Sequence, residues 1–226
     1  MPSRLLAVST SRLLEVPYRG ETMTTGIYKR AISGRAWVSS VTVGDDEQAD
    51  RDYHGGPDRA AYAYPVEHYG HFADVLPEGW SPGLFGENFT TEGLDEATTQ
   101  MGDVFGIGGA VFQVTEPRGP CFKLAHKLEA PAFPKRMLKA GKLGFYLRVL
   151  KEGYVEAGDA ITQLSREPHG VTVAELIETR WSKPRDLPAL ERALSVPSLS
   201  ESLRETLVRM RDAAGGDSQK DREIGR

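Results

Sequence analysis

The residue best suited to chemistry in this sequence is Cys121, the only cysteine among 226 residues. It lies in the segment EPRGPCFKL, residues 116–124, whose two prolines each fix a backbone φ angle and so predict a stiff, extended loop. Arg118 and Lys123 flank the sulfur, and nearby positive charge favours the thiolate, which is both a nucleophile and a metal ligand. The alternative is a small buried packing residue, the usual role of a lone cysteine. The stiff, cation-flanked backbone favours the reactive role.

Two glycine-containing segments could add binding groups to this cysteine. The sequence HGGP, residues 54–57, has two glycines that allow a ligand to approach the backbone, and the amide groups of such a turn can cradle an anion. An ordinary tight turn before a helix is the simpler interpretation. Asn88, within residues 85–89, can both donate and accept hydrogen bonds. It could therefore bind the edge of a heterocycle or cap a turn.

Metal binding by histidines or acids has weaker support. His68 and His71 are three positions apart in a predicted helix and could share a metal with His54, but the fourth ligand of a structural zinc site is missing. Residues 44–52 contain five acids, whose spacing does not match the calcium loop of an EF-hand. A solvated acidic loop is expected there, because exposed charges carry little energetic cost.

The composition restricts the classes of function. The chain is 39% hydrophobic and 27% charged, as is typical of globular proteins. A net charge of −4 and an isoelectric point near 5.8 argue against nucleic-acid binding, which requires a basic surface. No apolar run approaches the roughly 18 residues of a membrane span, and no signal peptide is recognisable at the start. One cysteine allows no intrachain disulfide, so a cytoplasmic location is expected.

The elements that position these residues are predicted to be strands first and helices last. Strands are expected at residues 5–9, 31–43, 103–107, 110–115, 145–150 and 160–164, with 31–43 either continuous or bent at Gly34. Gly108-Gly109 predicts a tight hairpin that leads directly into the cysteine loop. A loop is expected at residues 17–25, and helices at 124–128, at 134–140 and in the second half of 58–76.

The pattern changes to three short helices near Pro168. Thr172 to Glu175 has the sequence of a capping box, residues 186–194 form a second helix, and the box is repeated at Ser198 to Glu201 before a third. The tail from Gly215 is polar and is expected to fray. We therefore divide the chain into a first domain, residues 1–165, and a helical domain, residues 166–226.

Four stretches of the chain resemble the MOSC family, the molybdenum-cofactor sulfurase C-terminal domains. They are GDDEQADRDYHGGPDRAAYAYPVEHY (residues 44–69), FGENFTTEGL (85–94), MGDVFGIGGAVFQVTEPRGPCFKL (101–124) and GFYLRVLKEGYVEAGD (144–159). The likeness is greatest to small bacterial members of the YiiM type, which end in a three-helix domain. The resemblance implies a mostly β fold, with a β-barrel-like core, flanking short helices and a small C-terminal three-helix domain.

The resemblance also implies a function. It implies that Cys121 is the catalytic residue and a ligand of the molybdenum cofactor (molybdopterin), in an enzyme that reduces N-hydroxylated compounds, including toxic base analogues, to amines. The family's cofactor contacts map onto Lys29, Arg30, His54, Gly55, Asn88 and Arg118, and Lys123 would help to hold the cofactor phosphate. Gly119 differs from the family pattern, in which a serine is expected at this position.

The remaining expectations concern partners and alternatives. The chain has no iron–sulfur, haem or flavin motif, so electrons are expected from a separate reductase. The substrate would be a small molecule, no nucleic-acid or membrane partner is expected, and a homodimer is compatible with the sequence. Two alternatives remain open: a persulfide carrier that delivers sulfur from Cys121, and a cofactor- or oxyanion-binding module without activity.

Overall fold

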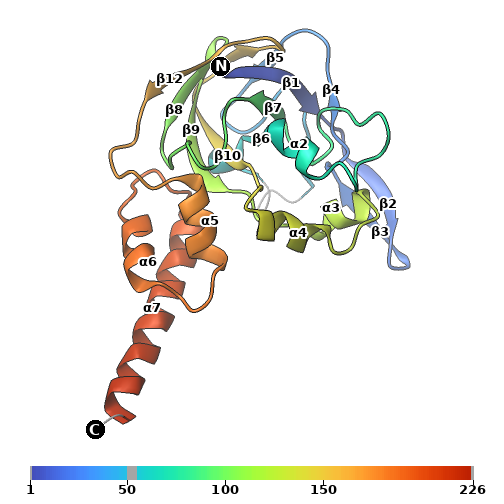
Figure 1. Ribbon diagram of the computed structural model, residues 1–226. Coiled ribbons are helices and arrows are strands. Elements are labelled where there is room, and N and C mark those ends of the chain that lie inside the picture. Colours follow the sequence, from blue (N-terminus) through green and yellow to red (C-terminus); the bar gives the residue numbers. More distant parts are fainter. Residues whose placement is uncertain (1, 50–54, 225–226) are drawn as a thin grey trace.

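A computed structural model describes residues 2–49 and 55–224 of the chain. Its largest element is an eight-stranded sheet with the strand order β12–β8–β9–β10–β6–β7–β1–β4 (Figure 1). Neighbouring strands are antiparallel except for β6 and β7. The strands of this sheet are β1 (Arg4–Thr10), β4 (Arg30–Ala31), β6 (Ala61–Pro65), β7 (Phe89–Glu92), β8 (Val104–Ile107), β9 (Ala110–Pro117), β10 (Phe145–Lys151) and β12 (Ile161–Ser165). The mostly β fold predicted from the sequence is confirmed.

The sheet curls without closing into a barrel. The start of β1 meets the residues before β12, where the amide of Leu5 donates to the carbonyl of Asp159 at 2.9 Å and one bridge pairs Arg4 with Ala160. No continuous ladder joins these ends among the described residues. The barrel-like core expected from the sequence is therefore an open, curled sheet, as right-handed strand twist produces in a sheet of this width.

Two small two-stranded sheets accompany the main one. The pair β2 (Leu14–Tyr18) and β3 (Glu21–Thr25) is a hairpin where the sequence predicted a loop. Its turn places Arg19 and Gly20 at φ angles of 52° and 85°, the positive pair of a type I′ turn, and arginine is an uncommon residue for that position. Residues 31–43 are interrupted near Gly34, leaving β4 and β5 (Ala36–Val38), and β5 pairs with β11 (Gly153–Val155).

Three short helices lie beside the sheet. They are α2 (Glu67–His71), α3 (Phe122–Lys127) and α4 (Phe133–Ala140), and Gly141 ends the last of them in the left-handed conformation, as predicted. The helix expected in the second half of residues 58–76 is only five residues long. The strand β6 occupies the preceding residues up to Pro65, because alternating Ala and Tyr side chains fill a position buried on both faces of the sheet.

The C-terminal helices are α5 (Val173–Trp181), α6 (Leu187–Leu194) and α7 (Glu201–Ile224). A short 3₁₀ helix, η1 (Pro57–Arg59), lies before β6 in the first part of the chain. The capping box at Thr172 is confirmed. The prediction of a second capping box at Ser198 is wrong. The hydroxyl of Ser200 accepts a hydrogen bond from the amide of Leu203 at 3.2 Å and caps α7 instead. This helix continues through residues 215–224, where a frayed tail was expected.

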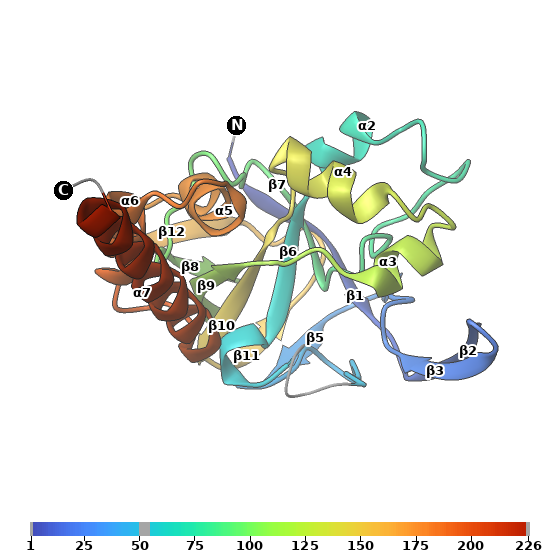
Figure 2. The same ribbon diagram turned by 90° about the horizontal axis from the view of Figure 1, so that it is seen from below.

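The helices and the sheet share one hydrophobic core. Phe112 and Val114 of β9 belong to the same cluster of buried side chains as Leu176 of α5 and Leu203 of α7. Figure 2 shows these helices at one end of the sheet and the β2–β3 hairpin at the other. The strands β9, β10 and β6 lie between them, and the cysteine loop leaves from the end of β9.

Candidate functional site

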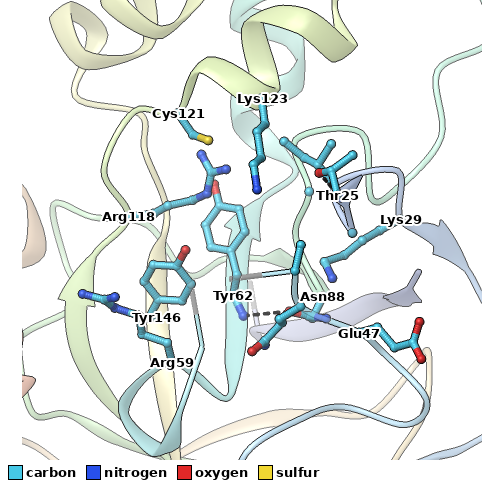
Figure 3. A pocket seen from close by; sticks show the side chains of 15 residues that line it. Thr25, Lys29, Glu47, Arg59, Tyr62, Asn88, Arg118, Cys121, Lys123 and Tyr146 are labelled. Carbon is cyan, nitrogen blue, oxygen red and sulfur yellow. Dashed lines mark hydrogen bonds between the residues drawn. The ribbon is translucent and has the colours of Figure 1, made fainter. Parts of the chain in front are cut away.

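The cysteine loop forms one wall of a pocket of about 570 Å³, counting the part open to solvent. Its lining residues come from β3, β6, β10, η1, the cysteine loop, the start of α3 and the segments before β4, after β5 and before β7 (Figure 3). The lining residues are Thr25, Gly26, Ile27, Lys29, Glu47, Gln48, Ala49, Arg59, Tyr62, Gly86, Asn88, Arg118, Cys121, Lys123 and Tyr146. Four of them carry a positive charge and Glu47 a negative one. Lys29 and Arg59 are paired with buried carboxylates, so the suitability of the pocket for an anion depends on Arg118 and Lys123.

Cys121 is the N-cap residue of α3 and has an extended backbone, with φ −129° and ψ 135°. Its side chain is unoxidised and 8% exposed, so the sulfur is recessed without being sealed from the pocket. Figure 3 shows the sulfur next to the guanidinium of Arg118, with the Lys123 side chain extending into the same space. The described structure thus places a soft donor atom beside two cations.

Arg118 is the most unusual charged residue of the pocket. It is 6% exposed, and no carboxylate among the described residues forms an ion pair with it. Its guanidinium lies 4.8 Å from the centre of the Tyr62 ring and hydrogen-bonds with the Tyr146 side chain. Burial opposes the charge, but the nearby oxygens of these two tyrosines raise the pKa of Arg118. A buried cation without a carboxylate partner is costly unless an anionic ligand completes it.

Two tyrosines hold this arginine in place. The Tyr62 hydroxyl donates to the carbonyl of Leu143 at 2.7 Å, and the Tyr62 and Tyr146 rings are 5.5 Å apart. Burial raises the pKa of Tyr62 and of Tyr146, against the opposing effect of Arg118. Both phenols therefore remain protonated and act as neutral hydrogen-bonding supports.

A second polar group lines the opposite wall. The ammonium of Lys29 pairs with both carboxylate oxygens of Asp46, and Asn88 donates to the same carboxylate at 2.9 Å. Burial lowers the pKa of Lys29, although Asp46 opposes that shift. Asp46 is 7% exposed, so the expectation of a solvated loop at residues 44–52 is wrong for this residue. Asp46 is drawn inside because it neutralises Lys29.

The structure separates the other predicted site residues from this pocket. Lys29, Asn88, Arg118, Cys121 and Lys123 converge on it. Arg30 is exposed on β4 and lines a different hollow, and Gly55 lies in a shallow depression with Asp58 and Glu201. His54 lies outside the described residues, as do Asp50 and Asp52.

No metal-binding group of three His, Cys, Asp or Glu side chains is present in the described part of the chain. Metal binding by histidines, which had little support in the sequence, gains none here: His68 Nε2 lies 2.6 Å from Glu96 Oε2 in a buried pair, and His54 lies outside the described residues. Sequence reasoning also missed the lining residues Tyr62, Tyr146 and Arg59. The alternation of Ala and Tyr in residues 61–64 was a signal for Tyr62 alone, and it predicts burial without indicating a pocket.

Comparison with known proteins gives the class to which this fold and site belong. The model for the MOSC domain matches residues 50–162, and the model for the YiiM-like, 3-alpha helix domain matches residues 171–214. The chain belongs to the MOSC family and carries the YiiM-like helical domain at its C-terminal end. No helix in the described residues is long and apolar enough to span a bilayer.

Individual relatives agree with this assignment. The chain is 37% identical over 208 residues to "Uncharacterized protein YflK" from Bacillus subtilis, covering 92% of this chain and 94% of that protein. It is 36% identical over 169 residues to a protein named "Reductase" from Gibberella moniliformis, covering 73% of this chain but only 30% of that longer protein. The crystal structure of YiiM from Geobacillus stearothermophilus superposes with a TM-score of 0.79 at 30% identity, covering 93% of this chain and all of that one.

Proposed function

We propose that this chain binds the molybdenum cofactor in the pocket beside Cys121 and reduces N-hydroxylated compounds to amines. The membership of the MOSC family supports a molybdenum-cofactor role in general terms. The relative named "Reductase" supports redox chemistry. The substrate class is the one that the family resemblance implies.

One observation carries the proposal: a recessed thiol and a buried arginine without a carboxylate partner among the described residues face the same pocket. A molybdopterin-type cofactor needs a soft ligand for its metal and a cationic site for its phosphate. Cys121 offers the first, and Arg118 with Lys123 offers the second. The donor set therefore fits this cofactor.

The residues have separate roles in this proposal. Cys121 would hold the metal through its sulfur, and Arg118 would bind the phosphate with its guanidinium held by Tyr146. Asn88 and Lys29 would face the pterin from the opposite wall. When bound, the cofactor would supply two-electron chemistry at a metal with open coordination positions, while the protein fixes its orientation.

The overall reaction requires two electrons and two protons. The N–O bond breaks, the nitrogen becomes an amine, and the oxygen leaves as water: R–NHOH + 2 e⁻ + 2 H⁺ → R–NH₂ + H₂O. A separate reductase would deliver the electrons.

The proposal can be tested on protein purified from a host that makes the cofactor. We expect molybdenum and pterin to copurify with the wild type, and the protein to reduce an N-hydroxylated base analogue to the amine when electrons are supplied by a separate reductase. Cys121→Ser keeps the size of the side chain but replaces a soft ligand with a hard one. It should lose the activity while retaining the fold measured by circular dichroism.

Thiol alkylation distinguishes the alternatives. Under the proposal, Cys121 resists alkylation while the cofactor is bound and reacts after it is removed. A mass increase of one sulfur on Cys121 with no molybdenum present would instead favour a persulfide carrier. Full activity of the Cys121→Ser variant would refute the ligand role.

A further inference from the structure

The first residues of the helix α7 contact the sheet directly beside the pocket. Ser200 is 1% exposed, and its hydroxyl donates to Glu116 Oε2 at 2.6 Å. Its amide also donates to the carbonyl of Thr115 at 3.2 Å. The helix therefore begins on the last residues of β9, immediately before Arg118 and Cys121.

The carboxylate of Glu116 joins this contact to the pocket. Glu116 is 3% exposed, and its second oxygen accepts the Nε–H of Arg59, a pocket-lining residue. Arg59 Nη2 then donates to Ser202 Oγ at 2.6 Å, and Ser202 Oγ lies 3.4 Å from Ser200 Oγ. These four side chains close a hydrogen-bonded ring, here called the clamp: Arg59, Glu116, Ser200 and Ser202.

The clamp contacts Tyr146, one of the two tyrosines that support Arg118. The guanidinium of Arg59 lies 5.8 Å from the centre of the Tyr146 ring, and Glu116 is the cross-strand partner of Tyr146 in the β9–β10 ladder. Tyr146 is the residue whose side chain hydrogen-bonds with Arg118. Glu116 is also only two positions before Arg118 in the chain. A shift in the clamp would thus move the side chain and the backbone on which Arg118 depends.

Charge makes this arrangement sensitive to the loss of one partner. Arg180 of α5 lies close enough to interact with both Glu116 and Arg59, and burial lowers its pKa, with Glu116 opposing that shift. Glu116 therefore balances more than one buried or half-buried cation. A buried carboxylate that loses a hydrogen-bond donor reorganises or recruits another cation, because an unmet acceptor is costly.

We propose that Ser200 and Ser202, which belong to the helical region, are positioning residues of the pocket's anion site and act on Arg118 through Glu116, Arg59 and Tyr146. The inference rests on the anion-binding role proposed above for Arg118. It makes the start of α7 part of the functional site, because Ser200 and Ser202 supply two of the four side chains of the clamp.

The variants can be chosen to separate positioning from helix capping. Ser200→Gly removes the hydroxyl, and glycine at a helix N-cap is tolerated nearly as well as serine. Ser200→Thr keeps both the hydroxyl and the cap. Ser202→Ala leaves the cap untouched and removes one hydrogen bond to Arg59. Thr206→Ala, one turn further along α7, removes a hydroxyl that bonds only within the helix and serves as the matched control.

The measurement is the affinity of the full-length, cofactor-free protein for inorganic phosphate, followed by ³¹P NMR titration well below the melting temperature. We expect Ser200→Gly to bind phosphate about fivefold more weakly, the effect of one net hydrogen bond, and Ser202→Ala about twofold more weakly. Ser200→Thr and Thr206→Ala should bind like the wild type. Weaker phosphate binding by Ser200→Gly, which keeps most of the helix cap but loses the hydroxyl, is the result that a purely structural role of the cap would not predict.

Two contrary results have different meanings. If Arg118→Met lowers phosphate affinity while Ser200→Gly and Ser202→Ala do not, the clamp does not position the site and this inference is wrong. If Arg118→Met binds phosphate as tightly as the wild type, the anion site itself is wrong and the inference falls with it. Should Ser200→Gly fail to fold, unchanged binding by Ser202→Ala alone overturns the proposal.

Discussion

The substitution Arg118→Met removes the positive charge on which the proposed cofactor site depends. Methionine retains much of the length of the arginine stem, so the contact with the Tyr62 ring is largely kept while the guanidinium is lost. The hydrogen bond that Arg118 donates to the Tyr146 hydroxyl is lost as well, but Tyr146 keeps its place in the β9–β10 ladder. The change therefore acts mainly on the ligand.

The size of the effect follows from the number of hydrogen bonds that the Arg118 guanidinium can donate to a ligand. No carboxylate among the described residues occupies its guanidinium, so at least one charge-assisted hydrogen bond to a phosphate is available. Such a bond contributes about 1.5–3 kcal/mol. We therefore expect cofactor retention to weaken by about tenfold to a hundredfold, since each 1.4 kcal/mol is a factor of ten.

The assay is the dissociation of cofactor during dilution, measured as molybdenum and pterin fluorescence remaining with the protein. Arg136→Met is the matched control, because Arg136 pairs with Asp74 on the surface and lies outside the pocket. The control should retain cofactor like the wild type. Equal retention by Arg118→Met and the wild type would show that the phosphate lies elsewhere and that the argument from the unpaired arginine is mistaken.

Three further predictions concern the surroundings of the site. Gly119→Ser should leave cofactor retention and melting temperature unchanged, because a Cβ there would meet only Trp181 at 3.8 Å; Gly144→Ser should destabilise the fold strongly, since a Cβ would lie 2.4 Å from the carbonyl of Ala63. Burial lowers the pKa of Lys127 to about 8, so between about pH 8 and about pH 10 the unfolded state binds more protons than the folded state. The free energy of unfolding of the wild type, measured by urea titration, should therefore rise with pH across that window, and Lys127→Met should flatten the rise; parallel curves would contradict the shift. A chain ended at Ser165 should lose cooperative thermal unfolding, because the helices complete the core and bond to Glu116; a sharp transition at the wild-type temperature would show the first domain to be independent.

Local signals in the sequence predicted the elements around the cysteine well. The Gly108-Gly109 turn, the helices after Cys121 and the capping box at Thr172 each depend on residues close together in the chain, and all are present. The β2–β3 hairpin was missed because its turn uses Arg19 at a positive φ angle, which residue preference disfavours. The false second capping box shows the limit of the same reasoning, since two serines two positions apart compete and only packing selects Ser200.

The pocket depended on long-range pairing that the sequence could not reveal. Cys121, Arg118 and Lys123 could be grouped because they lie in one loop. Tyr62, Tyr146 and Arg59 join them only through the strand order β9–β10–β6, which no local pattern specifies. Asp46 was expected in solvent for the same reason, because its partners Lys29 and Asn88 are 17 and 42 positions away.

The central claim is that Cys121 supplies the sulfur ligand of a bound molybdenum cofactor. X-ray absorption spectroscopy at the molybdenum K edge, on wild-type protein and on Cys121→Ser loaded with cofactor, tests it most directly. We expect the wild-type spectrum to require one more sulfur neighbour than the variant spectrum, with an oxygen taking its place in the variant. Identical sulfur shells in the two proteins would contradict the claim.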